Sequence, residues 1–172
     1  REIIDDILDV QKMEAGEMSF DFAEIEVVSL IKDTVELNEQ HALMSNVKLL
    51  MLSDENVIYI KGDSRRIKQA VTNLLSNAIK YSPEQGTVTV KVERNNSGVI
   101  ISVSDNGPGI EKDFQELVFD KFSQSKSKLT RRVGGTGLGL AIVKHIVDAH
   151  NGYVAFETSA AKGTTFNIVL PN

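Results

Sequence analysis

Two asparagines and a lysine share one face of an expected helix. Asn73, Asn77 and Lys80 are spaced i, i+4 and i+7, which places them beside the apolar stripe of that helix. Asparagine is a poor helix former because its side chain competes for backbone groups, so two on one face call for a reason. An amide oxygen can complete the coordination of Mg²⁺ when phosphates and waters supply the other ligands, and a lysine can bind phosphate. The face predicts a magnesium–phosphate site, with a solvated helix face as the alternative.

A first glycine cluster, Asp105-Asn-Gly107-Pro-Gly109, follows the end of an expected strand. Glycines let the backbone turn sharply and approach a ligand closely. A carboxylate at a buried strand end can accept a hydrogen bond from the amino group of adenine, and a base without that donor would leave the acid unpaired. The alternative is a plain turn, because these residue types are also common in turns.

A second glycine cluster, Gly134-Gly-Thr-Gly-Leu-Gly139, runs directly into an apolar helix expected over residues 138–150. Free N–H groups at a helix start, together with the helix dipole, favour phosphate. A Walker A loop is excluded because Leu140 follows the last glycine, and the dinucleotide fingerprint would need a preceding strand and another spacing. The alternative is a flexible hinge before a core helix.

The loop between the two clusters is long and basic. Residues 110–136 look largely irregular, and a loop of this length is usually functional or disordered. We expect a lid over a polyphosphate, with Phe119 and Phe122 as packing anchors. The alternative is a mobile loop with hydrophobic anchors. The basic residues of the loop are Lys121, Lys126, Lys128, Arg131 and Arg132.

The composition narrows the classes of protein. With 172 residues the chain can form one good core with at most an appendage. A net charge of −5 argues against a general nucleic-acid binder, because it leaves no broad basic footprint. No apolar run approaches the roughly 20 residues that span a bilayer, and the charged start is not typical of a signal peptide. Cysteine is absent, which excludes disulfides and thiolate metal sites.

Hydrophobic periodicity predicts the elements that must position these residues. The first helix has no N-cap before Ile3 and reads as a piece of a longer helix that Gly16 ends, with a native amphipathic start as the alternative. Two hairpins are expected, one with its turn at residues 53–56 and one with its turn at 95–98. The order of the expected helices and strands along the chain favours a mixed sheet covered by helices on one face. Helices are expected over 28–45, 64–81 (capped by Asp63) and 138–150, and strands over 18–27, 47–52, 57–60, 87–93, 99–104, 153–157 and 164–170.

Four motifs in this order resemble those of the catalytic ATP-binding domain of sensor histidine kinases. That domain belongs to a wider group that also includes gyrase-type and heat-shock-chaperone-type ATPases. The resemblance covers nearly the whole chain, and residues 1–15 resemble the end of the second helix of the dimerisation hairpin. The motifs are the asparagine box Asn73-x-x-x-Asn77-Ala-x-Lys80-Tyr81, the first glycine box Asp105-x-Gly107-x-Gly109, the phenylalanine box Phe119-Asp-Lys-Phe122 and the second glycine box Gly135-Thr-Gly137-Leu-Gly139.

The resemblance implies an α/β (α+β) two-layer sandwich of the Bergerat type: a mixed, mostly antiparallel sheet backed by three helices, with a long ATP lid. It implies two regions, the hairpin end over 1–16 and the catalytic domain over 17–172. It also implies ATP and Mg²⁺ as bound groups, with Asn77 and Asn73 at the metal and Asn73 and Lys80 as catalytic residues. The ATP-contacting residues would be Asn77, Lys80, Tyr81 (near adenine), Asp105 (reading its amino group), Gly107, Gly109, Ile110, Lys121, Phe122, Arg132, Gly135, Thr136, Gly137, Leu138 and Gly139.

Two differences between this sequence and the family pattern refine the expected function. The phospho-accepting histidine of the family lies in a His-Glu/Asp-Leu-Arg-x-Pro-Leu setting, and His41, His145 and His150 have no such neighbours. We expect structural or surface histidines, so the chain should bind ATP yet fail to label itself. The related ATPases place a glutamate where Asn73 stands, and an amide cannot act as that base. A histidine nucleophile needs little base assistance, so catalysis reduces to holding the γ-phosphoryl group in line and neutralising its charge.

We therefore interpret the chain as a protein-histidine kinase domain in the cytoplasm. It would transfer the γ-phosphoryl group of ATP to a histidine on a dimerisation helix absent from the chain, for relay to a response-regulator aspartate. The expected partners are ATP and ADP, that helix of a homodimeric parent kinase and a receiver domain, with no nucleic acid. The alternatives are a nucleotide-sensing module without transfer activity, a serine kinase of the anti-sigma-factor type, and an ATPase.

Overall fold

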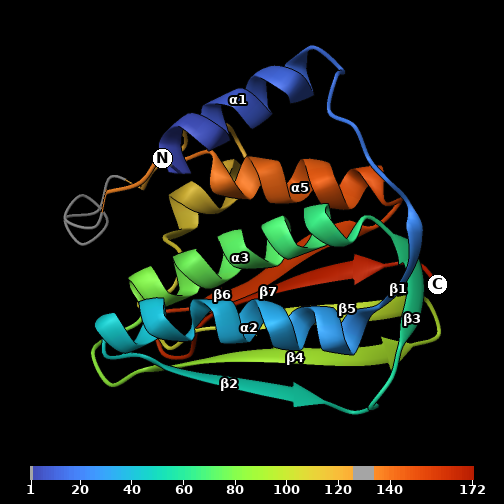
Figure 1. Cartoon of the computed structure of the whole chain (residues 1–172). Coiled ribbons are helices and arrows are strands. Elements are labelled where there is room, and N and C mark those ends of the chain that lie inside the picture. The colour runs from blue at the N-terminus through green and yellow to red at the C-terminus, as the bar shows by residue number, and fades with distance from the viewer. Residues whose placement is uncertain (1, 126–133) are drawn as a thin grey trace.

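Five strands with alternating burial form one mixed sheet in the computed structural model, which describes residues 2–125 and 134–172 (Figure 1). In β4, Val88, Val90 and Val92 are fully buried and the residues between them face the other side, as the two-residue period of a strand requires. The strand order is β2-β4-β5-β7-β6, and every pairing except β2–β4 is antiparallel. The strands are β2 (Lys48–Ser53), β4 (Thr87–Asn95), β5 (Gly98–Ser104), β6 (Tyr153–Ser159) and β7 (Gly163–Leu170).

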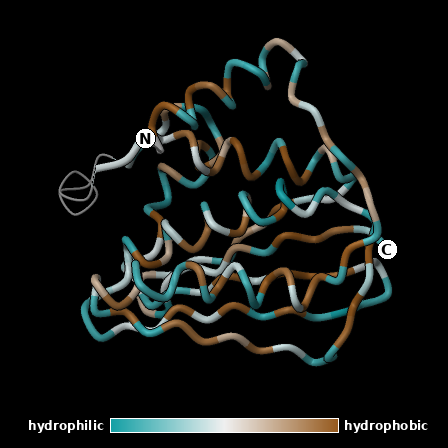
Figure 2. The backbone as a smooth tube through the Cα atoms, viewed as in Figure 1, coloured by the Kyte–Doolittle hydropathy of each residue, from teal (hydrophilic) through white to brown (hydrophobic). Residues whose placement is uncertain are grey.

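Three helices cover one face of this sheet: α2 (Val27–Met44), α3 (Ser64–Tyr81) and α5 (Gly139–Ala149) (Figure 1). Their apolar residues pack onto the sheet, with Leu75 and Ile142 fully buried. Figure 2 shows the same pattern, with apolar stretches along the strands and on the helix layer above them. The expected two-layer sandwich, a mixed and mostly antiparallel sheet backed by three helices, is confirmed. Among the described residues, no helix combines the length and apolarity needed to cross a membrane.

Helix α1 (Glu2–Glu14) lies outside this layer, beside α5 (Figure 1). As expected, Gly16 lies in the cap that follows its last residue, and the φ of +67° there suits a glycine. The N–H groups of Gly16 and Glu17 donate to the carbonyls of Met13 and Lys12, which satisfies two carbonyls that the helix end leaves free.

One expected hairpin does not form. Strands β2 and β3 (Tyr59–Gly62) are not partners: β2 pairs in parallel with β4, whereas β3 pairs antiparallel with β1 (Ala23–Glu26) in a separate two-stranded sheet. The Glu26 carboxylate explains the choice, because it accepts from Ile58 N–H at 3.1 Å while capping α2 through Val28 and Ser29. Turn chemistry at residues 53–56 therefore marks a bend in the chain and does not decide the partner strand. The hairpin of β4 and β5 forms as expected.

Asp63 fixes the start of α3, as its sequence position predicts. Its carboxylate accepts from Arg66 N–H at 3.0 Å and from Asp21 N–H at 2.8 Å. Burial raises the pKa of Asp63, but these N–H donors and the charge of Arg65 outweigh it, so the pKa falls below 3.8. The N–H of Asp63 itself donates to His150 Nε2 at 2.9 Å, so His150 links the end of α5 to the start of α3.

Replacing Asp63 by alanine should lower the free energy of unfolding by about 2–4 kcal/mol, because it removes a helix cap and leaves a buried N–H unpaired. Urea denaturation measures this loss, and Asp33→Ala on the exposed side of α2 is the control. Because the pKa of Asp63 is lowered in the folded state, its contribution should be present above pH 3.8 and lost as the pH falls through the folded-state value. An unchanged urea midpoint in Asp63→Ala would rule out this anchoring role.

Candidate functional site

The polar face of α3 lies beside the start of α5. Asn73, Asn77 and Lys80 are half-buried, which sets them at the border of the core as their spacing predicts. Asn73 Nδ2 donates to the Gly139 carbonyl at 3.2 Å, so its amide joins the two helices. This bond uses the nitrogen and leaves the oxygen of Asn73 as the acceptor on that face.

Lys80 connects this face to the second glycine cluster. A Cβ built on Gly135 would lie 2.6 Å from Lys80 Nζ, so the ammonium and the glycine backbone are close neighbours. The same ammonium lies 5.1 Å from the centre of the Tyr81 ring. Burial lowers the pKa of Lys80 below 10.5, because a half-buried ammonium lacks part of its hydration. An anion bound here would restore the lost stabilisation of the charge.

Asp105 directly follows β5 and is a buried carboxylate with 9% of its surface exposed. Its Oδ1 accepts from the N–H of Gly107 at 2.8 Å and from the N–H of Thr164 at 3.3 Å. Burial raises the pKa of Asp105 above 3.8, and the two N–H donors oppose that rise. A carboxylate in this setting gains from a further donor, such as an amino group on a bound base.

The first glycine cluster packs directly against its neighbours. A Cβ on Gly107 would lie 2.6 Å from the Tyr81 carbonyl oxygen, so glycine is needed where the turn meets the end of α3. Gly109 has a φ of +78°, and a Cβ there would lie 2.7 Å from the Ser159 carbonyl oxygen. The N–H of Ile110 then donates to Thr158 Oγ1 at 2.8 Å. The cluster therefore places Asp105 beside the end of the asparagine helix.

The second glycine cluster leads into α5 with an open helix start. No side chain among the described residues caps the first N–H groups of α5. Thr136 Oγ1 accepts from Leu138 N–H and donates to Asp6 of α1, both at 3.2 Å. Gly137 has a φ of +71°, and a Cβ there would lie 2.8 Å from the carbonyl carbon of Phe122. The two ends of the intervening loop are thus held together at the start of α5.

The two phenylalanines expected as anchors behave differently. Phe119 packs against Phe156 and Phe166, with ring centres 6.0 and 6.2 Å apart. Phe122 is 68% exposed and has a φ of +60°, so the expectation that it packs as an anchor is wrong. Its backbone packs closely against Gly137, while its ring is left exposed.

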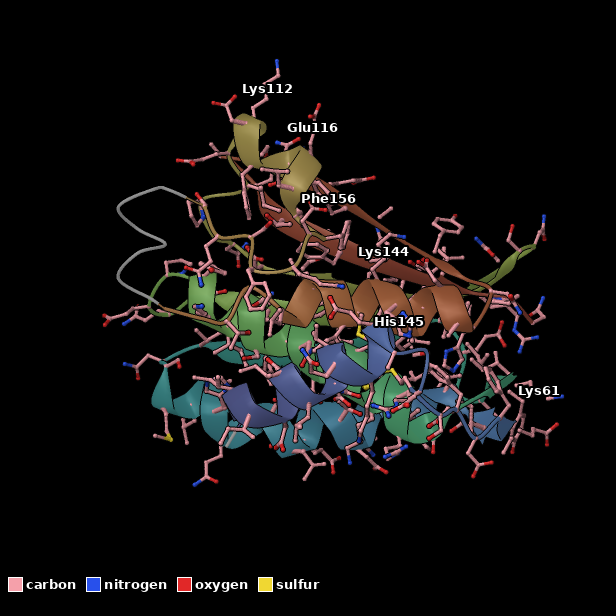
Figure 3. The ribbon with its side chains drawn as sticks, turned by 90° about the horizontal axis from the view of Figure 1, so that it is seen from above. Lys61, Lys112, Glu116, Lys144, His145 and Phe156 are labelled. Atoms are coloured by element: carbon pink, nitrogen blue, oxygen red, sulfur yellow. The ribbon has the colours of Figure 1, made fainter. Side chains whose placement is uncertain are left out.

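Lys121, one of the expected nucleotide ligands, lies away from this face and is paired with α1. Lys121 Nζ pairs with Glu14 of α1 at 2.7 Å. It lines a cavity of about 390 Å³ between α1, α5 and residues 119–121, where Lys144 and His145 project from α5 (Figure 3). Arg132, together with Lys126, Lys128 and Arg131, lies outside the described residues. Between the two glycine clusters the structure adds the short helix η1 (Lys112–Leu117), from which Lys112 and Glu116 point outward (Figure 3).

The histidines have the structural or surface character that was expected. His150 is buried, and because its Nε2 accepts from Asp63 N–H, its Nδ1 carries the proton that it donates to the Ile146 carbonyl at 2.7 Å. Burial lowers the pKa of His145, aided by the charges of Arg66 and Lys121 and opposed by that of Asp148. His41 is exposed on α2.

Sequence reasoning missed the threonines beside Asp105. Thr164 donates its N–H to the carboxylate, and its hydroxyl lies 2.9 Å from that of Thr158. A Cβ on Gly163 would lie 2.1 Å from the Asp105 carbonyl oxygen, so β7 passes close to the acid. The pattern Gly163-Thr-Thr was the available signal, since a glycine before two threonines at a strand start favours close backbone approach.

The donor set fits a magnesium ion that nucleotide and water largely coordinate. The described residues contain no group of three or more His, Cys, Asp or Glu side chains able to hold a metal. Mg²⁺ in phosphate-binding sites usually keeps several waters and takes few protein ligands. The amide oxygens of Asn77 and Asn73 on α3 suit that arrangement, and Lys80 adds positive charge for the phosphates.

Comparison with known proteins agrees with this geometry. Residues 62–172 match the family described as histidine kinase-, DNA gyrase B- and HSP90-like ATPase. The circadian input-output histidine kinase CikA of Synechococcus elongatus is 36% identical over 172 residues, which is 99% of this chain and 23% of CikA. The chain thus spans about a quarter of the length of this curated relative.

Solved structures show the same fold. The catalytic domain of histidine kinase ThkA is 30% identical with a TM-score of 0.77, over 88% of this chain and 97% of that domain. ThkA in complex with the response regulator TrrA is 26% identical with a TM-score of 0.78, over 99% of this chain and 48% of that one.

Proposed function

The chain belongs to the family of histidine kinase-, DNA gyrase B- and HSP90-like ATPases, as a catalytic ATP-binding domain of the sensor histidine kinase type, and from this premise we propose that it transfers the γ-phosphoryl group of ATP to a histidine on a partner helix. One observation carries the proposal. Several polar groups converge around the end of α3: the half-buried Asn73, Asn77 and Lys80, the buried Asp105, and the open start of α5.

Each part of this convergence suits one part of the nucleotide. Asp105 accepts from the adenine amino group, and the Tyr81 ring packs near the base. Lys80 and the free N–H groups at the start of α5 bind the phosphates, because an ammonium and a helix N-terminus both favour negative charge. The chain therefore holds the γ-phosphoryl group at the open side of α3, where an acceptor from outside the domain can approach in line.

Asn77 and Asn73 would hold Mg²⁺ with the phosphates and waters. The metal would neutralise charge that develops on the phosphoryl oxygens. Asn73 has a second role, because its nitrogen is committed to the Gly139 carbonyl and it carries no carboxylate. Water near the γ-phosphoryl group would then find no carboxylate at position 73 to activate it, which favours transfer over hydrolysis.

We further infer that residues 1–16 are the end of the second helix of a dimerisation hairpin and that residues 17–172 are the catalytic domain. Helix α1 is joined to the rest by the buried Val10 and by polar contacts, in which Asp9 accepts from Arg66 at 3.3 Å and from Gln69 at 2.6 Å. Four of its apolar side chains are exposed, which suits packing against further helices of a homodimer. They are Ile3, Ile4, Ile7 and Leu8.

The partners follow from the transfer chemistry. A phosphohistidine on the hairpin would pass its phosphoryl group to an aspartate of a response-regulator receiver domain, and the structure of ThkA with TrrA supports a partner of that kind. We place the domain in the cytoplasm, where ATP is available.

Labelling in trans tests the proposal. The chain is mixed with γ-labelled ATP, Mg²⁺ and the histidine-bearing hairpin of the same kinase. We expect label on the hairpin that is labile in acid and stable in base, as phosphohistidine is. Label on serine, or ATP binding without any label on the hairpin, would contradict the proposal.

A further inference from the structure

We propose that the Thr158 hydroxyl is the positioning group for Asp105 and that it thereby sets the preference of the site for adenine over a base without the amino group. This inference rests on the proposed function, in which Asp105 reads that amino group. Thr158 lies on β6 and does not contact the carboxylate itself. It acts through the two segments that do.

The first segment is the turn that follows Asp105. Gly107 N–H donates to Asp105 Oδ1 at 2.8 Å, and the turn ends where Ile110 N–H donates to Thr158 Oγ1 at 2.8 Å. A Cβ on Gly109 would lie 3.1 Å from the same oxygen, so the turn is packed directly on Thr158. The hydroxyl therefore fixes the far end of the segment that supplies the first donor.

The second segment is the start of β7. Thr164 N–H donates to Asp105 Oδ1 at 3.3 Å, while the Thr164 carbonyl accepts from Asp105 N–H at 2.9 Å. Thr158 and Thr164 are paired residues of the β6–β7 ladder, and their hydroxyls lie 2.9 Å apart. The same hydroxyl thus holds the segment that supplies the second donor.

A hydroxyl has one O–H and two lone pairs, enough to accept from Ile110 and to share a hydrogen bond with Thr164 at the same time. Both donors to the carboxylate therefore come from segments that meet at Thr158. Among the described residues, both bonds use Oδ1, so Oδ2 is left to accept from the base. Removing the hydroxyl leaves Ile110 N–H unpaired and frees the Thr164 hydroxyl to rotate. The orientation of the Asp105 carboxylate, and with it the position of Oδ2, is then less well fixed.

The test compares ATP with inosine triphosphate, in which an oxo group replaces the adenine amino group. Calorimetry gives both Kd values for the wild type and for Thr158→Val, which keeps the shape and loses the hydroxyl. We expect ATP binding to weaken about 10-fold while inosine triphosphate binding hardly changes, as for a misplaced hydrogen bond to a charged group. Thr158→Ser should restore the ratio of the two Kd values.

Thr165→Val is the matched control, because it removes a hydroxyl pair with Ser104 on the neighbouring position of β7 and leaves Asp105 untouched. Thr158→Ala serves as a second variant if valine prevents folding. A Kd ratio that stays at the wild-type value in these Thr158 variants, while Asp105→Asn abolishes it, would overturn the inference. If the wild-type chain binds both nucleotides equally, Asp105 does not recognise the adenine amino group, and that part of the proposed function is refuted.

Discussion

Replacing Asp105 by asparagine is expected to weaken ATP binding roughly 10- to 100-fold, the range for losing a hydrogen bond to a buried charged group. The backbone donors of Gly107 and Thr164 bind Oδ1, and the adenine amino group would donate to the other oxygen. In one orientation the NH₂ group of an asparagine would face the two backbone N–H donors. In the other orientation it would face the adenine amino group. The substitution therefore loses the base contact or disturbs the turn, although it adds no volume to the core.

Calorimetric titration with ATP and Mg²⁺ measures this loss. Asp113→Asn is a suitable control, because it removes one exposed carboxylate from η1 outside the site. Thermal unfolding of both variants checks that the fold persists. An Asp105→Asn affinity equal to that of the wild type would remove Asp105 from the nucleotide site.

Replacing Asn77 by alanine is expected to reduce phosphoryl transfer at least about 100-fold, because metal-assisted charge neutralisation in phosphoryl transfer depends on the position of the ion. Alanine is the best helix former, so α3 should keep its stability. The effect should also appear without any transfer: ATP binding should need a higher Mg²⁺ concentration in the variant.

Titration of Mg²⁺ at fixed ATP separates a metal role from a packing role. Ser76→Ala, at the preceding position of α3, is the control and should retain the wild-type Mg²⁺ dependence. If Asn77→Ala binds ATP with the same Mg²⁺ dependence as the wild type, the amide is not a metal ligand.

The helices and most of the sheet could be predicted because their signals are local. The apolar stripe of α3 and the Asp63 cap lie within a few residues of each other, and so do the turn and flanking strands of the β4–β5 hairpin. The partner of β3 could not be predicted this way. It depends on Glu26, a residue 32 positions from Ile58, whose carboxylate joins β3 to the start of α2.

The candidate site was predictable where unusual residue types cluster in sequence. Few purely structural explanations exist for two asparagines and a lysine on one helix face. The same holds for four glycines within the six residues that lead into a core helix. Thr158 and Thr164 escaped notice because threonine is ordinary in strands, and their relation to Asp105 arises from the register of three strands. Phe122 was misjudged because the sequence does not reveal that Gly137 packs against its backbone.

In the proposed function, Asn73 is the residue that favours transfer of the phosphoryl group over hydrolysis of ATP. It stands four residues before Asn77 on the same face of α3, and its amide nitrogen is bound to the Gly139 carbonyl. A carboxylate there could activate water, whereas an amide cannot. We therefore expect bound ATP to persist until a histidine arrives.

The most direct test is a single-turnover experiment with γ-labelled ATP, Mg²⁺ and excess chain, with and without the histidine-bearing hairpin. Without the hairpin, we expect the label to remain on ATP. With it, we expect the label to move to the hairpin histidine faster than free phosphate appears. Phosphate release at a rate that the hairpin does not change would contradict the proposed transfer and indicate a hydrolase.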